Sequence, residues 1–205
     1  MGFDKNSSLF TFFIGAITSL NLINSDNINF KNKNLITGKI FLILYGLKLL
    51  EYFIWFDDKC EYGINESANI MGGLIDNMIP SMIFILFTIK KRTFDNSLTY
   101  INAAYIFYVI FNYFNFLKND KLCTKVKTGQ TIVYGWNDNF NFAIYLFVLA
   151  FNIFRFYDSN QSYLIFFSIF ATLLINKIKK ADNIKILGLI TSFTPLLISK
   201  YQNNL

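Results

Sequence analysis

The sequence predicts an all-α protein, a polytopic bundle of transmembrane helices in a single domain over residues 1–205. Hydrophobic residues make up 54% of the chain, and charged residues only 16%, against about 25% in an average soluble domain. Ten Gly and two Pro are too few for the many turns of an all-β fold. The apolar residues also fall in long runs, as membrane-spanning helices require.

Seven apolar segments are candidates for membrane spans. A helix rises about 1.5 Å per residue and the hydrocarbon layer is about 30 Å thick, so one span needs about 20 residues. The expected spans are residues 8–24, 35–56, 67–89, 97–117, 140–157, 162–176 and 186–199. Because the last two segments are short, six spans with residues 186–199 lying in the membrane interface is the alternative.

The distribution of lysines predicts the orientation of this bundle. The positive-inside rule places the loops 25–34 and 90–96 in the cytosol, because they carry clustered Lys and Arg. The acidic loop 57–66 then lies outside. The lysines of loops 118–139 and 177–185 argue for the opposite orientation. We expect the N-terminus outside and the C-terminus in the cytosol.

Two cysteines fall on the same side of the predicted bundle, each just beyond a helix end. Cys60 lies in loop 57–66 and Cys123 in loop 118–139. They can form a disulfide that joins the two loops, which requires an oxidising compartment on that side. Two unrelated free thiols are the alternative, and the sequence leaves both open.

Six of the seven predicted spans carry a polar stripe at helical spacing on an otherwise apolar surface. The stripes are Ser8, Thr11 and Gly15; Tyr45, Lys48, Glu51 and Tyr52; Asn69, Gly73, Asp76, Asn77 and Pro80; Tyr105, Tyr108, Asn112 and Asn115; Asn141, Tyr145, Asn152 and Arg155; and Ser168, Thr172 and Asn176. Small and hydrogen-bonding residues commonly face neighbouring helices in lipid. The stripes therefore indicate either helix packing or a path for a ligand or solute.

Three ionisable residues lie well inside the predicted spans: Lys48, Glu51 and Asp76. A charge at the bilayer centre costs about 2.5–3.5 kcal/mol on insertion scales, so such residues pair with one another or face water. Lys48 can pair with Asp76 or with Glu51. The candidate ion or ligand site comprises Lys48, Glu51, Asp76, Asn77, Asn112 and Asn115.

Two prolines interrupt the predicted spans. Pro80 removes the hydrogen bond to the carbonyl of Asp76, and Pro195 does the same to the carbonyl of Thr191. Opened helices that present carboxylate, amide and carbonyl oxygens near the membrane centre hold cations in several transporters. A tolerated kink beside an ion pair that serves packing alone is the simpler alternative.

The absence of histidine excludes Ser–His–Asp triads, His-ligated zinc and His-ligated haem. Two cysteines cannot form a Cys₄ metal site. We expect no cofactor, no metal and no nucleic-acid partner, with the lysines serving as interfacial anchors at the lipid bilayer. The sequence does not favour an enzyme, because only carboxylates remain for acid–base chemistry inside the membrane.

The run Leu50–Trp55 (LEYFIW), an acidic turn with Cys60 and Asn65, and a helix broken at Pro80 resemble uncharacterised multi-pass membrane proteins of large DNA viruses and algae. The resemblance covers residues 1–90 and implies a membrane protein, without a mechanism. Two functions therefore follow from the sequence. The chain handles an ion, small solute or ligand at its charged core, or it is a structural or assembly component of a cellular or viral membrane.

Overall fold

The computed structural model describes residues 5–25, 30–91, 96–118, 122–124, 141–157 and 191–202, together with the short stretches 162–163, 165–167 and 169–170. The long helices are α1 (Lys5–Ile23), α2 (Lys31–Phe56), α3 (Ile64–Lys91), α4 (Asn96–Leu117), α5 (Phe142–Phe156) and α8 (Thr194–Gln202). The described ranges contain no strand, which confirms the all-α prediction.

The first five predicted segments each coincide with one helix, because their apolar runs are longer than any strand needs. The described residues between 162 and 170 are also helical, whereas 171–190 and the loop 177–185 lie outside the described residues. Within and just after the predicted segment 186–199, residues 191 and 192 are helical, Phe193 forms a turn, and α8 runs from Thr194 to Gln202. The helical run is thus interrupted at Phe193, and Pro195 lies in the first turn of α8, where proline is tolerated.

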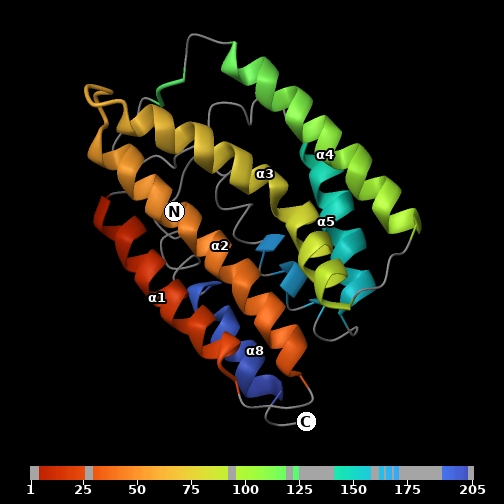
Figure 1. Cartoon of the computed structure of the whole chain (residues 1–205). Coiled ribbons are helices and arrows are strands. Elements are labelled where there is room, and N and C mark those ends of the chain that lie inside the picture. The colour runs from red at the N-terminus through yellow and green to blue at the C-terminus, as the bar shows by residue number, and fades with distance from the viewer. Residues whose placement is uncertain are drawn as a thin grey trace.

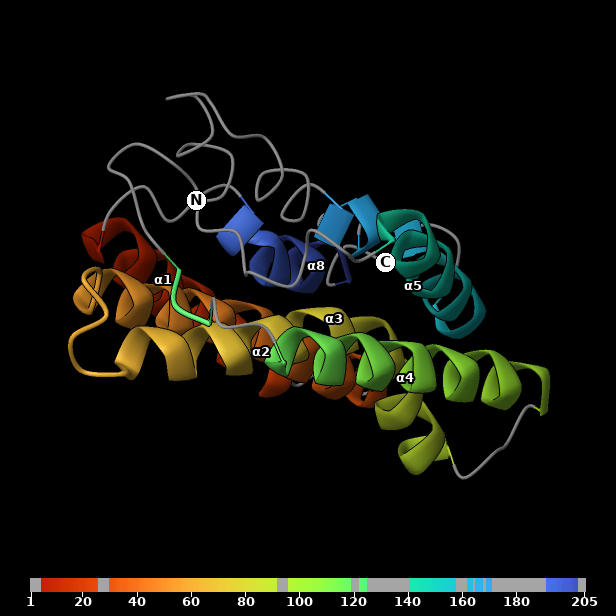
Figure 2. The ribbon, with the colours of Figure 1, turned by 90° about the horizontal axis from the view of Figure 1, so that it is seen from above.

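The helices pack as an antiparallel series. α1 lies along α2 and α2 lies along α3, while α3 also contacts α4 and α5. α8 packs against α1 and α2. Figure 2 shows α5 and α8 together on one side of the row formed by the other helices. α3 stays helical through Pro80 but changes direction partway along its length (Figure 1).

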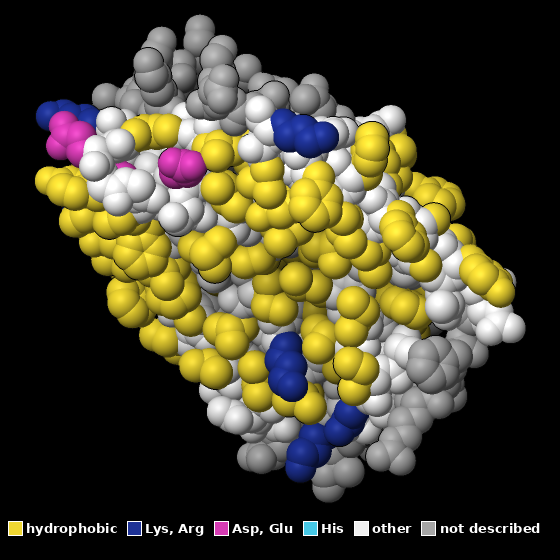
Figure 3. All heavy atoms as spheres, turned by 45° about the horizontal axis from the view of Figure 1, so that its top comes forward, with side chains coloured by type: hydrophobic (Ala, Val, Ile, Leu, Met, Phe, Trp, Pro, Cys, Tyr) yellow, Lys and Arg dark blue, Asp and Glu magenta, His cyan; other side chains and the backbone are white. Residues whose placement is uncertain are grey.

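Many polar side chains are buried in this bundle beside its hydrophobic core, while many large hydrophobic side chains are exposed. On α1 the exposed positions are Phe10, Phe13, Ile17 and Leu20. The buried positions on the same helix are Ser8, Thr11, Gly15, Thr18, Ser19 and Leu22. Figure 3 shows one face of the molecule covered largely by hydrophobic side chains, with the acidic side chains gathered at one end. This arrangement is the reverse of that on a soluble amphipathic helix.

Two helices are long and apolar enough to cross a membrane by length and composition, Lys5–Ile23 and Ile64–Lys90. They correspond to the first and third predicted spans. α2 is long enough but carries charged residues, α4 carries several asparagines, and α5 has only 15 residues. Within the described residues, the structure thus supports an all-α protein with two candidate spans, and the seven spans that the sequence predicted remain a prediction.

Candidate functional site

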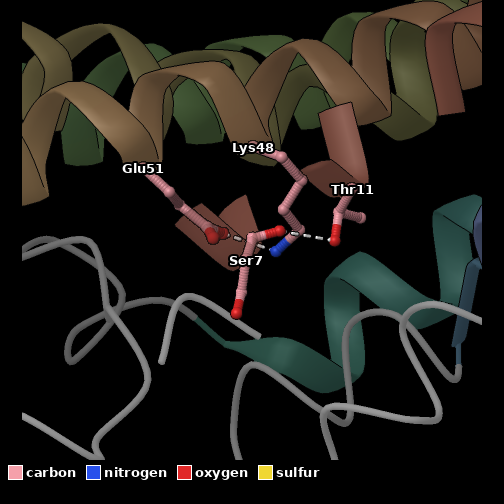
Figure 4. Close-up of polar contacts among 4 residues, drawn as sticks. All are labelled: Ser7, Thr11, Lys48 and Glu51. Atoms are coloured by element: carbon pink, nitrogen blue, oxygen red, sulfur yellow. Dashed lines mark hydrogen bonds and ion pairs between the residues drawn. The ribbon is translucent and has the colours of Figure 1, made fainter. Parts of the chain in front are cut away.

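A buried ion pair lies on the face of α2 that α1 covers. Lys48 and Glu51 are 3% and 2% exposed, and Lys48 Nζ lies 2.5 Å from Glu51 Oε1. Figure 4 shows Ser7 and Thr11 of α1 beside this pair, with the Thr11 hydroxyl donating to the Ser7 carbonyl. Of the two partners that the sequence left open for Lys48, the structure selects Glu51. The two residues are three apart, a spacing at which helical side chains meet.

The second carboxylate oxygen of Glu51 is the unusual feature of this pair. Glu51 Oε2 is buried and accepts no hydrogen bond from any described residue. Ser8 Oγ, on the buried face of α1, also lacks a partner within the described part of the chain. A buried carboxylate oxygen without a donor is costly, and it is satisfied by a water molecule, a cation or a proton.

We call the contact between these two helices the α1–α2 seam, made by Ser8, Thr11, Gly15, Tyr45, Lys48 and Glu51. The helices approach closely at Gly15, where an added Cβ would lie 2.1 Å from the Tyr45 ring. The Tyr45 hydroxyl in turn donates to the carbonyl of Thr191, at 2.5 Å. This carbonyl is the one that Pro195 leaves without its helical donor. On one side, the seam is therefore fastened to Thr191, three residues before α8.

Asp76 belongs to a different part of the interior. It lies on α3, one turn before Pro80, and is 7% exposed. Tyr105 of α4 and Tyr145 of α5 are both buried and close enough to its carboxylate to interact electrostatically. Of the charged residues that the sequence predicted, Lys48 and Glu51 thus lie in the α1–α2 seam, and Asp76 lies near Tyr105 and Tyr145.

Neutral amides join α3, α4 and α5 around the proline. Asn102 and Asn152 exchange side-chain hydrogen bonds of 3.0 and 2.9 Å, and both side chains are fully buried. Asn152 Nδ2 also donates to the carbonyl of Pro80, at 2.9 Å. The Tyr105 hydroxyl donates to the carbonyl of Asn77, at 2.8 Å. We call these residues the amide cluster.

The remaining predicted site residues do not join either group as ligands. The Asn77 amide is buried but donates to Gly73 within α3, and the Asn112 amide donates to Tyr108 within α4. Asn115 is exposed, so its assignment to the interior is wrong. The reason is rotation, because Asn115 precedes the buried Phe116 by one residue and points about 100° away from that face.

The sequence reasoning missed the role of Asn102. Its signal was present, since Asn102 lies three residues before Tyr105 and extends the stripe of α4 toward the N-terminus of that helix. It named Asn65 and Asn69 near the start of α3 but did not predict their partners. Nothing in their helical spacing indicates that their partners lie in a segment more than fifty residues away in the chain.

Asn65 and Asn69 bind the segment 122–124 beside a disulfide. Cys60 and Cys123 are joined, with their Cα atoms 6.2 Å apart, so the open question about these thiols is answered in favour of the bridge. Asn65 Nδ2 donates to the carbonyl of Thr124 and Asn65 Oδ1 accepts its N–H, both at 2.9 Å. The connection after α4 is therefore fastened to the α2–α3 turn by covalent and hydrogen bonds together.

Asp57 organises the turn itself. Its carboxylate accepts backbone N–H groups from Glu61, Tyr62, Ile64 and Asn65, at 2.9–3.2 Å. Burial alone raises the pKa of Asp57, but these four donors outweigh that effect and hold the pKa below its usual value. The turn thus depends on an ionised carboxylate.

Within the described ranges, no group of three or more Cys, Asp and Glu side chains is placed to hold a metal ion. Comparison with family models, with curated proteins and with solved structures finds no match to this chain. The resemblance to membrane proteins of large DNA viruses and algae therefore stays a prediction.

Proposed function

We propose that the chain is an integral membrane protein whose buried charges handle a proton, another small cation or a small solute. The observation that carries this proposal is the Lys48–Glu51 pair, in which Glu51 Oε2 is buried and accepts no hydrogen bond within the described residues. A proton added at Oε2 converts the carboxylate to a neutral acid and weakens its hold on Lys48. The pair therefore offers two charge states at one place in the bundle.

The reversed distribution of side chains supports membrane embedding. Large apolar surfaces on a monomer are rare in water and mark contact with lipid or a partner. The exposed faces of α1, α4 and α5 are rich in Phe, Ile and Leu. In lipid, where apolar contacts give no drive for helix association, small and polar residues face neighbouring helices instead.

Two independent features favour one orientation in that membrane. The end with the α2–α3 turn carries the acidic residues Asp58, Glu61 and Glu66 beside Lys5, Lys59 and Lys118, together with the Cys60–Cys123 bridge. At the opposite end, the described charged side chains are basic: Lys31, Lys33, Lys90, Arg155 and Lys200. Positive charge stays in the cytosol and disulfides form in oxidising compartments. We place the α2–α3 turn and the N-terminal end of α1 outside.

Flux measurements on reconstituted protein test the proposal. Wild-type protein in liposomes loaded with a pH-sensitive dye is given a pH step, and parallel samples receive rubidium or sodium tracer. We expect flux of at least one of these ions, and its loss in Glu51→Gln and in the double variant K48M/E51L. The double variant removes both charges, a replacement that is often neutral or stabilising in a buried pair.

Glu61→Gln is the matched control, because Glu61 is exposed in the α2–α3 turn. Folding is followed in every sample by size-exclusion chromatography and thermal unfolding. Flux that persists in a well-folded K48M/E51L protein would contradict the proposal. The proposal would also be contradicted if liposomes with wild-type protein showed no flux of any of the three ions above that of empty liposomes.

A structural or assembly role in a membrane is the second candidate, and the amide cluster favours it. Asn102, Asn152, Tyr105 and the carbonyls of Asn77 and Pro80 satisfy one another across three helices. Such contacts hold helices together without any ligand. This candidate predicts that Asn152→Leu reduces stability while no variant of Lys48 or Glu51 changes ion flux.

A further inference from the structure

A groove runs along the outer face of α5 and has a volume of about 420 Å³. Its walls are Phe147, Ala150, Phe151, Phe154 and Arg155, which recur at the spacing of one helix face. Ala150, the smallest of these side chains, lies between the larger ones. The lining is almost entirely apolar, and Arg155 lies at one end of it.

The wall of this groove is held in place by ring contacts. Phe147 stacks on Phe151, with centroids 6.0 Å apart. Phe154 packs edge-on against Tyr163 at 5.4 Å and also contacts Phe166 at 5.8 Å. A groove with packed walls keeps its shape when an apolar chain enters it, which lowers the entropic cost of binding.

The position of Arg155 matches the depth of a lipid headgroup. It lies in the last turn of α5, which is next to the basic end of the bundle. Phe147 lies eight residues earlier, or about 12 Å deeper along the helix axis. Arg presents five N–H donors in a planar fork that suits phosphate, so one guanidinium can bind phosphate in addition to a protein neighbour.

We infer that this groove binds an anionic phospholipid from the leaflet at the basic end, with the phosphate at Arg155 and an acyl chain against Phe147, Ala150 and Phe151. Charge complementarity selects the occupant, because the one charged group of the groove is cationic and the surrounding end of the described molecule is basic. Basic pockets on the cytoplasmic side of membrane proteins bind anionic headgroups for the same reason. The inference rests on the proposal that the chain is embedded in a membrane.

Native mass spectrometry of the full chain tests this inference. Protein in detergent is mixed with phosphatidylglycerol or with phosphatidylcholine of the same acyl chains, and the retained lipid is counted. We expect wild-type protein to retain phosphatidylglycerol preferentially. Arg155→Gln should weaken that binding about fivefold and leave phosphatidylcholine unchanged, since one basic group near an anionic lipid contributes about that factor.

Matched variants separate the two parts of the site. Ala150→Leu fills the groove and should reduce retention of both lipids, whereas Ala104→Leu on the exposed face of α4 should not. Lys118→Gln removes an exposed charge at the opposite end and should leave binding as in wild type. Equal retention of both lipids by wild type, or equal effects of Arg155→Gln and Lys118→Gln, would overturn the inference. A dimer lost in Ala150→Leu would instead assign the groove to a second copy of the chain.

Carbonate extraction of cell membranes distinguishes failure of the lipid site from failure of the membrane proposal. If the wild-type chain stays in the membrane pellet but does not discriminate between headgroups, only the lipid site is wrong. If carbonate releases the chain, the membrane proposal on which the lipid site rests is wrong as well.

Discussion

The α1–α2 seam and the amide cluster are two polar interiors in one bundle, and they are built from different chemistry. The seam contains a charged pair, a close approach at Gly15 and a carboxylate oxygen without a hydrogen-bond donor in the described chain. The cluster contains neutral amides and carbonyls that satisfy one another across α3, α4 and α5. Both lie among helices whose outer faces are apolar.

The comparison shows that buried polar groups have two different roles in this fold. Neutral groups that complete each other's hydrogen bonds account for helix association and need no ligand. A charged group that keeps one oxygen unsatisfied is not explained by packing, because apolar side chains of the same size would pack at lower cost. The following substitutions test that distinction, and they are given in order of decreasing expected effect.

Removing one charge of the seam should have the largest effect. Glu51→Ala leaves Lys48 buried without its partner, and breaking a buried pair in this way costs about 3–5 kcal/mol. The double variant K48M/E51L should recover most of the lost stability. Thermal unfolding in detergent measures both. If Glu51→Ala unfolds at the wild-type temperature, the pair is not buried as described.

Removing the disulfide should loosen the connection after α4 from the α2–α3 turn. Cys60 belongs to the α2–α3 turn and Cys123 to the connection after α4, with 63 residues between them. Cys60→Ser should lower the free energy of unfolding by about 2–4 kcal/mol, the usual contribution of a native bridge. Unfolding with and without reductant measures the effect, and reductant should not change the variant.

Adding a side chain at Gly15 should push α1 and α2 apart at the seam. An Ala side chain there collides with the Tyr45 ring, which cannot turn away without giving up its bond to Thr191. Overpacking of this kind costs about 1–3 kcal/mol. Gly46→Ala is the control, since a Cβ at Gly46 meets nothing within 4 Å. It should be neutral or stabilising, and equal effects of the two changes would show that the seam is not closely packed.

Removing an amide from the cluster should cost less. Asn152→Leu removes the hydrogen bonds that Asn152 makes with Asn102 and with the Pro80 carbonyl, for a loss of about 1–2 kcal/mol. Asn112→Leu serves as the control, because the Asn112 amide bonds only to its own helix among the described contacts. Ion flux should remain in Asn152→Leu. Loss of flux at wild-type stability would remove the distinction between the cluster and the seam.

The smallest expected effect is a pH-dependent loss of thermal stability when the α2–α3 turn is altered at Asp57. Because the pKa of Asp57 is lowered in the folded state, its carboxylate stabilises the fold above the unfolded pKa, and this contribution is lost as pH falls through the folded pKa. Asp57→Asn should therefore unfold at a lower temperature than wild type at neutral pH, and the gap should narrow in acid. Asp58→Asn, at an exposed position, should show wild-type behaviour across a pH series.

Much of the local structure was predictable from the residues. The first five apolar runs became α1 to α5, and the stripes on α1 and α2 became buried faces as expected. Helical periodicity was enough for this, because it relates each residue to its neighbours on one face. The same reasoning placed Asn115 wrongly, since a stripe that drifts by one residue turns about 100° and leaves the interface.

The candidate site was only partly predictable. Lys48, Glu51 and Asp76 were recognised as buried charges from their positions inside apolar runs. The partner of Lys48 was not predictable, because a lysine can reach a partner on its own helix or on the next one. The pairing of Asn102 with Asn152 likewise depends on the rotation of α4 against α5, which neither stripe specifies.

By itself, the sequence determined that this protein is helical, that its helices have polar faces and apolar faces, and that few charges lie away from the loops. These properties follow from composition and from spacing within single helices. Only the tertiary structure decided that Lys48 pairs with Glu51, that Asp76 lies with Tyr105 and Tyr145, and that Cys60 meets Cys123. The physical reason is that helix period is a local property, whereas contacts between helices depend on how whole surfaces pack together.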